Sequence, residues 1–464
     1  MPCAHEAPHR TFRDPAGSLE IRPDGVFRSI APAYAAEVRR FLAHPLAQNF
    51  IAKGRLIASE VQPHDDSQPM QLRHPRVPFI SYPWEWPPAL WLAAADLTLG
   101  LATDLLREDW ILKDATPLNV LFQGTRPVFV DVLSIEPADL SQPVWLPYGQ
   151  FVRTFVLPML AHGQLGWPLH AIMMRRDGYE PEDLYASLPW KKRLRQPARS
   201  AVTLPMLLAK FSSGKNSNVR PRKINDPHAT RHILHSTFKS LRQQMHRTAP
   251  PLRSSAWSDY ASTASHYTTS GHEAKRRFVA AALSASQPRH VLDVGCNTGT
   301  YSRLAAETGA SVVSIDIDLQ AVNRLAVSLA NSTLDILPLC VDLAHPTPAA
   351  GWNNRESLSF LSRAEGHFDT VLMLAVLHHL LIGSQIPLNH IATLCCSLTT
   401  RNLILEWVPP SDPKFQQILR GRDALYAHIT EAAFRQAFAQ HFDIAQEETL
   451  ENGRILFHLV RSVH

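Results

Sequence analysis

The chain has 464 residues, of which 45% are hydrophobic and 19% charged, and this predicts two or three globular domains with sizeable cores. The formal net charge of +5 is local: residues 190–253 hold 15 Lys or Arg and one acid, Asp226, while the rest holds 31 basic and 40 acidic residues. A local basic stretch does not mark the whole surface as a nucleic-acid binder.

The same sequence argues against membrane spans, secretion and metal clusters. No apolar run reaches the ~18 residues that span a bilayer, and the N-terminal MPCAHEAPHRTFRDP has no signal-peptide core. The five cysteines show neither disulfide nor metal spacing. We therefore expect a cytoplasmic protein with no membrane span and no metal site.

Residues 1–211 predict an α+β domain. GVFRSI (25–30) and RLIASEV (55–61) have strand patterns, and AAEVRRFLAHPL (35–46) has a helical one. VPFISYPWEWPP (77–88) indicates a buried, structured loop, and PALWLAAADLTLGLATDLL (88–106) a strongly apolar helix.

The next stretch, LKDATPLNVLFQGTRPVFVD (112–131), has the spacing of a kinase catalytic loop. Asp114 is followed five residues later by Asn119, and Asp131 closes a hairpin-like run; in kinases these positions accept the substrate proton and hold metal ions. The segment resembles the C-lobe of kinase-like phosphotransferases, but WILKD has no His at the usual place before Asp114, no Phe-Gly follows Asp131, and no Gly-rich loop occurs upstream. An active kinase, a degenerate kinase-like binding domain and an unrelated fold all stay open.

A basic linker is expected at residues 212–230. SSGKNSNVRPRKINDPHA (212–229) is rich in Ser, Asn, Pro and basic residues and has no apolar period. We interpret the whole stretch 190–253 as a solvated linker that docks on the acidic remainder; the alternative is contact with an anionic partner such as nucleic acid or a phosphorylated carrier.

Residues 231–464 alternate strands and helices, a pattern typical of a parallel sheet. RHVLDVG, SVVSIDI, ILPLCVDL, DTVLMLAVL and NLILEWV are the expected strands. FDIAQEETLENGRILFHLVRS predicts a terminal hairpin that turns at Asn452-Gly453 and adds an antiparallel edge.

The stretch VLDVGCNTGTYSRLAAETGASVVSIDID (291–318) carries the main chemical signal. A strand ends near Asp293, Gly295 and Gly299 form a tight loop before a helix, and the second strand ends in Asp316. Glycines let a backbone approach a ligand, and a carboxylate about twenty residues on is placed to bind a ribose diol. The third strand ends in Asp342, placed to meet an adenine amino group.

The D-x-G-x-x-x-G spacing resembles the class I S-adenosylmethionine-dependent methyltransferases over roughly residues 250–464 and lacks the GK[ST] of triphosphate-binding loops. The resemblance implies a Rossmann-like, seven-stranded α/β sheet and S-adenosyl-L-methionine as cofactor. The implied cofactor-binding residues are Asp293, Gly295, Cys296, Asn297, Gly299, Asp316, Ile317, Asp342 and Ala375. A generic Rossmann-like domain and a methyltransferase domain without activity are the alternatives.

The fourth and fifth strands supply candidate catalytic residues. His378 and His379 follow the fourth strand, where the family places substrate-facing residues, and a neutral His can act as base. Glu406 ends the fifth strand and is placed to orient a histidine; for all three residues a structural role is the alternative. Because no N-P-P-Y-type segment follows the fourth strand, we expect an oxygen or carbon acceptor on a small-molecule or carrier-bound substrate, ahead of nucleic acid.

Two further segments are candidates for substrate contact. Trp257, Tyr260 and Tyr267 precede the first strand and predict an aromatic lid or plain helix packing. The insertion that carries Arg355 and Glu356 is expected either to build substrate contacts or to be an ordered surface loop.

The motifs LKDATPLN, YPWEW and VLDVGCNTG together resemble a bacterial methyltransferase family, some of whose members carry nodulation-protein labels. The main hypothesis is therefore a methyltransferase. The alternatives are a partner-binding protein with an inert cofactor domain and a bifunctional enzyme with phosphotransfer activity.

Overall fold

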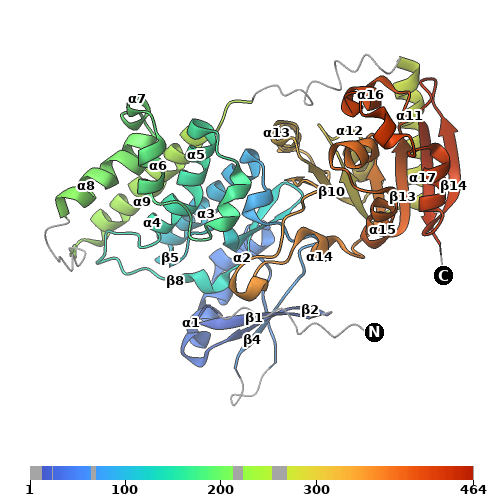
Figure 1. The fold of residues 1–464 in the computed structure, drawn as a ribbon. Coiled ribbons are helices and arrows are strands. Elements are labelled where there is room, and N and C mark those ends of the chain that lie inside the picture. Colours follow the sequence, from blue (N-terminus) through green and yellow to red (C-terminus); the bar gives the residue numbers. More distant parts are fainter. Residues whose placement is uncertain (1–12, 23, 64–68, 213–222, 253–268, 463–464) are drawn as a thin grey trace. The chain divides into compact units, whose positions relative to one another are not determined.

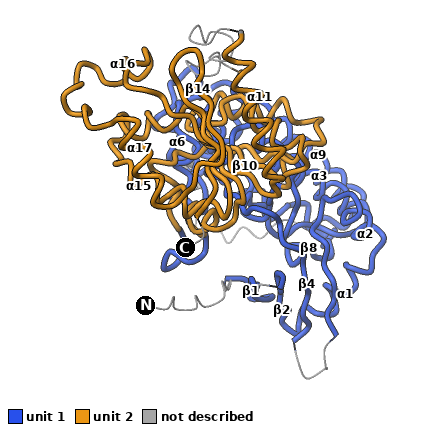
Figure 2. Tube along the Cα trace, turned by 90° about the vertical axis from the view of Figure 1, so that its right-hand side faces the viewer, with its two compact units in different colours: residues 1–122, 126–251, 350–357 blue, residues 123–125, 252–349, 358–464 orange. Residues whose placement is uncertain are grey.

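The computed structural model describes residues 13–22, 24–63, 69–212, 223–252 and 269–462. Two compact units divide these residues (Figure 2). Unit 1 comprises residues 1–122, 126–251 and 350–357, and unit 2 comprises residues 123–125, 252–349 and 358–464.

Unit 1 begins with a four-stranded antiparallel sheet and continues as a mainly helical body. The sheet order is β1-β2-β4-β3, with strands β1 (Gly17–Arg22), β2 (Gly25–Ile30), β3 (Glu60–Val61) and β4 (Gln71–His74). Helices α1 (Pro32–Ala43) and α2 (Pro45–Ala52) lie between β2 and β3 in the chain. The predicted strand at 55–61 is thus reduced to the two residues of β3.

The middle of unit 1 contains the kinase-like stretch as a set of short strands. The long helix α3 (Pro88–Arg107) precedes β5 (Trp110–Leu112), which pairs with β8 (Ile135–Pro137). Between them, β6 (Val120–Gln123) and β7 (Arg126–Phe129) form a two-stranded sheet. The apolar helix and the hairpin-like run therefore form where the sequence predicts them.

Among the described residues, α3 alone is long and apolar enough to cross a membrane by length and composition, and 61% of its apolar window is buried in the structure. This corrects the expectation that no segment reaches that length. The burial is that of a core helix, since Leu90, Trp91 and Leu101 are almost fully enclosed.

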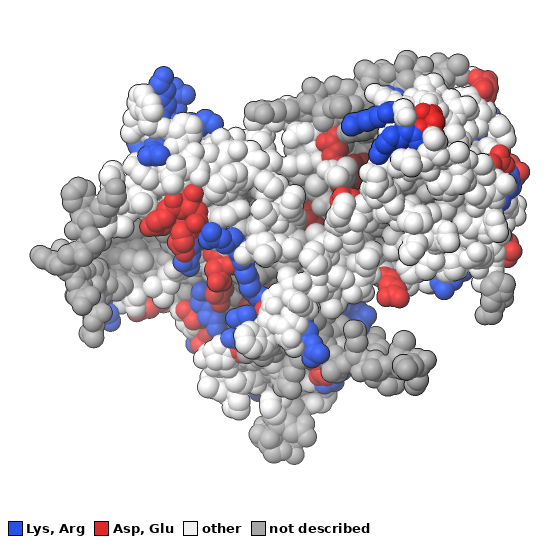
Figure 3. All heavy atoms as spheres, viewed as in Figure 1, with Lys and Arg blue, Asp and Glu red and all other residues white. Residues whose placement is uncertain are grey.

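The basic stretch 190–253 forms helices of unit 1 wherever the structure describes it. These elements are α7 (Trp190–Arg193), η6 (Arg199–Thr203), α8 (Leu204–Ser212) and α9 (Pro227–Thr248). Helix α9 packs on α3, and its buried residues include Leu234 and Phe238, whose ring contacts that of Trp145. The units consequently divide at residue 251 instead of 230, and the linker interpretation fails for α7–α9; residues 213–222 lie outside the description. Basic side chains gather over α7 (Figure 3).

The rest of the helical body of unit 1 lies between β8 and α7 in the chain. Its elements are α4 (Tyr148–Phe151), η4 (Val152–Val156), α5 (Leu157–Leu165), η5 (Leu169–Met174) and α6 (Pro181–Ser187).

Unit 2 is a seven-stranded sheet with the order β11-β10-β9-β12-β13-β15-β14 (Figure 1). The strands are β9 (His290–Val294), β10 (Ser311–Asp316), β11 (Ile336–Cys340), β12 (Phe368–Met373), β13 (Thr399–Trp407), β14 (Phe442–Thr449) and β15 (Ile455–Arg461). Every predicted strand is present. Strand β15 alone is antiparallel to the other strands of this sheet, and it lies between β13 and β14. The sequence predicted an antiparallel strand at the edge of the sheet, whereas β14 occupies the edge and β15 is its inner neighbour.

Helices pack on this sheet through interleaved apolar residues. The described helices of unit 2 are α11 (Thr269–Ser286), α12 (Thr300–Glu307), α13 (Leu319–Ser328), α14 (Phe360–Ala364), α15 (Leu388–Leu398), α16 (Pro413–Leu419) and α17 (Glu431–Phe438), of which α11, α12, α13 and α15 contact the strands directly. One core joins α11, α12 and α13 to alternate strand residues such as Val291, Val312 and Leu372. Helix α15 packs on β12 and β13 and contacts α17. Alternate residues of a strand face opposite sides of the sheet, and the buried residues of β9 and β12 include both faces, so the apolar runs in these strands are nearly continuous.

Candidate active site

The loop that joins β9 to α12 is built on residues with left-handed backbone conformations. The φ angles are +73° at Gly295, +51° at Asn297 and +86° at Gly299. A Cβ added at Gly295 would lie 2.3 Å from Cγ2 of Val376, and one at Gly299 would lie 2.4 Å from Cδ1 of Leu325. Both glycines are therefore required by conformation and by close packing.

Asp316 closes this loop from the end of the neighbouring strand. Its Oδ2 accepts a hydrogen bond from the backbone N–H of Asn297 at 2.8 Å, and its Oδ1 accepts one from the N–H of Asp318 at 2.9 Å. Burial raises the pKa of Asp316, and these two N–H groups oppose the rise. Ile317, the next residue, is exposed. The predicted ribose acid thus touches the Gly-rich loop directly.

Asp293 and Cys296 lie beneath the loop, inside the protein. Asp293 is 2% exposed and accepts a 2.6 Å hydrogen bond from Oγ of Ser302 on α12. Burial is the largest cause that raises the pKa of Asp293 to about 6. Cys296 packs in the core of α11–α13, and burial raises the pKa of its thiol. Both side chains support the loop from below.

Asp342 and Ala375 lie just beyond the ends of β11 and β12. Oδ1 of Asp342 accepts from the N–H of Ala344 at 2.9 Å, and its Oδ2 lies 2.9 Å from Nδ1 of His345. Ala375 has a φ of +57°, and its neighbour Val376 is the residue that approaches Gly295. The ends of four adjacent parallel strands therefore carry all the predicted cofactor residues, at one rim of the sheet.

The two adjacent histidines differ in burial. His378 is 3% exposed, burial lowers its pKa to about 3, and its Nδ1 has no hydrogen-bond partner among the described residues. His379 is half-buried, and its pKa is lowered by burial and then by Arg454 and Lys414. Both imidazoles are neutral near pH 7, and His379 is the more accessible.

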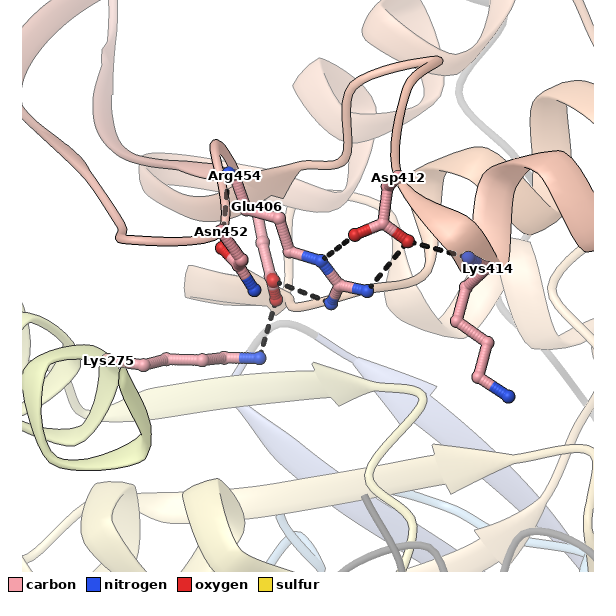
Figure 4. A network of polar contacts seen from close by, with 6 residues as sticks. All are labelled: Lys275, Glu406, Asp412, Lys414, Asn452 and Arg454. Carbon is pink, nitrogen blue, oxygen red and sulfur yellow. Dashed lines mark hydrogen bonds and ion pairs between the residues drawn. The ribbon is translucent and has the colours of Figure 1, made fainter. Parts of the chain in front are cut away.

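Glu406 lies at the centre of a buried ionic network (Figure 4). Its Oε2 is 2.5 Å from Nζ of Lys275, and its Oε1 is 3.1 Å from Nη1 of Arg454. Nε of Arg454 reaches Oδ2 of Asp412 at 2.8 Å, and all four side chains are almost fully buried. The two oxygens of Glu406 are thus bound by cations, where the sequence suggested a histidine partner.

Sequence reasoning missed Lys275, Arg454 and Asp412. The position of Lys275 could have been recognised from the sequence. It precedes Phe278 and Val279 by three and four residues, so it lies on the apolar face of α11. Its Nζ also lies 5.2 Å from the ring centroid of Tyr301 on α12. A lysine on a buried face predicts a buried acid, but its partner Glu406 is 131 residues away.

The kinase-like residues of unit 1 form a separate polar cluster. Asp131 pairs with Nη1 of Arg28 at 2.8 Å, and its Oδ2 accepts a 2.5 Å hydrogen bond from Oγ of Ser134. The same Oγ accepts one from Nδ2 of Asn119 at 3.1 Å. Burial raises the pKa of Asp114, and the charge of Asp131 adds to the rise. The described residues hold no group of three His, Cys, Asp or Glu suited to a metal ion.

A cavity of about 320 Å³ opens beside this cluster. It is lined by Tyr34, Glu37, Val38, Lys113, Leu133, Ile135, Glu136 and Pro137. Nζ of Lys113 lies 5.5 Å from the ring centroid of Tyr34. The cavity combines apolar walls with charges of both signs.

Two groups of sequence candidates remain, the aromatic residues before β9 and the insertion between β11 and β12. Trp257, Tyr260 and Tyr267 lie outside the described residues. Glu356 belongs to unit 1, where it pairs with Arg13 at 2.5 Å and Arg176 at 3.0 Å. The Arg13 hydrogen bond is the first cause that lowers the pKa of Glu356 to about 2, so Glu356 acts as an ionic anchor.

Comparison with known proteins agrees with these features. Residues 265–449 match the family described as a methyltransferase domain. The nodulation protein NoeA of Rhizobium meliloti (strain 1021) is 30% identical over 466 residues, which cover 97% of this chain and 95% of NoeA. The chain belongs to the NoeA family. This confirms the predicted methyltransferase domain and the resemblance to a family with nodulation-protein labels.

Two solved structures are more distant. The magnesium protoporphyrin IX methyltransferase of Synechocystis PCC 6803 with bound SAH is 24% identical, with 41% of this chain and 84% of that chain covered and a TM-score of 0.31. The N-methyltransferase NodS of Bradyrhizobium japonicum WM9 is 12% identical, with 42% and 98% covered and a TM-score of 0.32. Scores of this size carry no conclusion about function for this chain.

Proposed function

We propose that this protein is an S-adenosylmethionine-dependent methyltransferase acting on an oxygen or carbon atom of a small-molecule or carrier-bound substrate. The observation that carries the proposal is the direct bond between Asp316 and the Gly295–Gly299 loop at the rim of a sheet ordered β11-β10-β9-β12-β13-β15-β14. A methyltransferase domain that matches residues 265–449 supports the same reading.

The residues at this rim fit the cofactor. Val376 and Leu325 fill the space where side chains at Gly295 and Gly299 would lie, so this tight loop requires glycines, as a loop that brings its backbone close to a ligand does. Each oxygen of Asp316 accepts one backbone N–H and keeps a further lone pair for a ribose hydroxyl. S-adenosylmethionine, when bound, supplies an electrophilic methyl group.

On this proposal the chain's own residues divide into binding and positioning groups. The loop and Asp316 hold the cofactor, with Asp342 beside the adenine. Asp293 supports the loop through Ser302.

His379 is the proposed base for a hydroxyl or acidic C–H. It is neutral near pH 7 and less buried than His378, whose pKa of about 3 makes it a weak base. The Lys275–Glu406–Arg454 network positions the same rim by linking α11, β13 and the β14–β15 turn. Glu406 is on this account a positioning residue.

The test is transfer of labelled methyl from S-adenosylmethionine to pooled acceptors sorted by nucleophile: hydroxyl, acidic carbon, amine and nucleic acid. We expect label on an oxygen or carbon acceptor, and its loss in Asp316→Ala. His379→Gln should lower the rate and remove the fall in rate on the acidic side of the pH profile, where the base becomes protonated, while cofactor affinity holds. Label on nucleic acid, or an unchanged pH profile in His379→Gln, would contradict the proposal.

We infer a second role for unit 1, as a binding module without phosphotransfer. In an active kinase the acid at the position of Asp131 binds a metal ion, whereas here the guanidinium of Arg28 neutralises it at 2.8 Å. The adjacent cavity offers space for a ligand. Calorimetric titration of the full chain with ATP and Mg²⁺ tests this: we expect no Mg²⁺-dependent binding. Mg²⁺-dependent ATP binding that Asp131→Ala abolishes would contradict this inference and favour a phosphotransferase site.

A further inference from the structure

A segment of unit 1 exposes an apolar helix face to solvent. On α8, Leu204 is 51% exposed, Leu207 42% and Leu208 59%. These positions follow the i, i+3, i+4 spacing that places side chains on one face of a helix. In η6, directly before α8, Ala201 and Val202 are buried. The segment therefore packs into unit 1 by one side and turns a leucine stripe outward.

Two more large apolar side chains are exposed just upstream. Trp190 on α7 is 66% exposed, and Leu194, its C-cap residue, is 59% exposed. The five apolar residues lie within one stretch of the chain, residues 190–208, which we call the α7–α8 segment. Clustered exposed apolar residues on one surface element mark contact with a partner or a membrane.

The same segment is basic. Lys191, Arg195 and Arg199 are exposed, and no carboxylate of the described residues forms an ion pair with them. Residues 190–225 contain no Asp or Glu at all. Figure 3 shows the basic side chains that gather over α7. By contrast, Glu180 and Asp183 of α6 are paired with Arg153 and Arg175.

We propose that the α7–α8 segment docks on the surface of an anionic lipid bilayer. Exposed leucines enter the acyl boundary, the Trp190 indole occupies the polar–apolar interface, and Lys191, Arg195 and Arg199 face anionic headgroups. In this binding mode the α7–α8 segment lies on the surface of the bilayer and does not span it. It is independent of the methyl-transfer proposal, since every residue that carries it belongs to unit 1.

Charge and composition disfavour the other occupants. A second copy would bring this basic face against itself, where like charges repel. The neighbouring residues 213–222, SGKNSNVRPR, hold one apolar residue and no acid, so they offer neither cover for the leucines nor counter-charge. A nucleic acid would satisfy the cations and leave the leucine stripe in water.

The experiment is co-sedimentation of the full chain with vesicles of phosphatidylcholine alone or with about 30% phosphatidylglycerol. The informative variants are the triple Leu204→Ser, Leu207→Ser, Leu208→Ser and, separately, Lys191→Glu with Arg195→Glu. The matched control is Leu146→Ser with Leu425→Ser, two exposed leucines outside the segment. Circular dichroism melts establish that each variant is folded.

We expect binding to the anionic vesicles that weakens with salt, and little binding to the neutral ones. The triple Ser variant should bind at least about tenfold more weakly, and each reversed cation should cost about fivefold or more, while the control binds as wild type. Equal binding to both vesicle types, no binding to either, or unchanged binding of the triple variant would overturn the proposal. So would a dimer or a DNA complex that forms in place of vesicle binding and is lost in these variants.

Discussion

Replacing Asp293 by Asn should change the stability of unit 2 by an amount that becomes more favourable as pH rises. Burial raises the pKa of Asp293 from 3.8 to about 6. Between about pH 4 and pH 6 the Asp293 carboxyl is therefore protonated in the folded protein and ionised in the unfolded chain. The wild type therefore loses stability as pH rises from about 4 to about 6, and the loss near pH 7 amounts to about 3 kcal/mol. The Asn side chain does not titrate, so the variant does not lose this part of its unfolding free energy as pH rises.

The amide brings a cost of its own that does not vary with pH. Its oxygen can keep the hydrogen bond from Ser302, but its NH₂ group needs a partner, and a buried orphan costs about 1–3 kcal/mol. The pH dependence of the difference is therefore the quantity to measure. A companion variant, Ser302→Ala, removes a bond that lowers the pKa of Asp293 and should extend the loss of stability to higher pH than in the wild type.

The assay is urea unfolding of the full chain at a series of pH values, with pulse-labelled hydrogen exchange of the β9 peptide as readout. This readout reports unit 2 separately from unit 1. We expect the Asn-minus-Asp difference in unfolding free energy to rise by about 3 kcal/mol between about pH 4 and pH 7. If the difference in unfolding free energy between the two proteins does not change with pH, burial does not keep the Asp293 carboxyl group protonated.

Three further predictions concern the same unit. Asp316→Ala should weaken S-adenosylhomocysteine binding by about 10–150-fold, since a charged hydrogen-bond acceptor is worth about 1.5–3 kcal/mol; unchanged affinity in calorimetry would refute the ribose site. Gly295→Ala should lower the melting temperature and abolish cofactor binding, whereas Gly309→Ala, with φ of +92° and no atom near its Cβ, bears backbone strain alone and should retain binding. Lys275→Met should cost about 3–5 kcal/mol by leaving Oε2 of Glu406 buried without its lysine partner, since Arg454 contacts the other oxygen; urea unfolding should show partial recovery on adding Glu406→Gln, and no recovery would mean that lost packing causes the effect.

Much of unit 2 could be predicted because its signals are local. Apolar runs predict the buried parallel strands, Gly295 and Gly299 predict the tight loop, and Asn452-Gly453 predicts the turn of the hairpin. The position of Asp316 at a strand end follows from the same pattern. Local sequence patterns therefore predicted the strands and the loop, while the assignment of Asp316 to a ribose stays a prediction.

The rest depends on contacts between distant residues. Glu406 binds Lys275 and Arg454, which stand 131 and 48 residues away, so the sequence could not show that the acid is already paired. Helix α9 has a readable apolar face, but only the structure shows that its partner is α3 of unit 1. The basic composition of residues 190–253 led to an incorrect linker prediction, because the described part of this stretch forms ordered helices.

The most direct test of the proposed function is calorimetric titration of the purified full chain with S-adenosylhomocysteine, the product form of the cofactor. We predict one site with micromolar affinity, strongly weakened in Asp316→Ala and retained in His379→Gln. No heat of binding in a sample whose melt shows folded protein would contradict the account, because the loop and carboxylate would then fail at the one task their geometry supports.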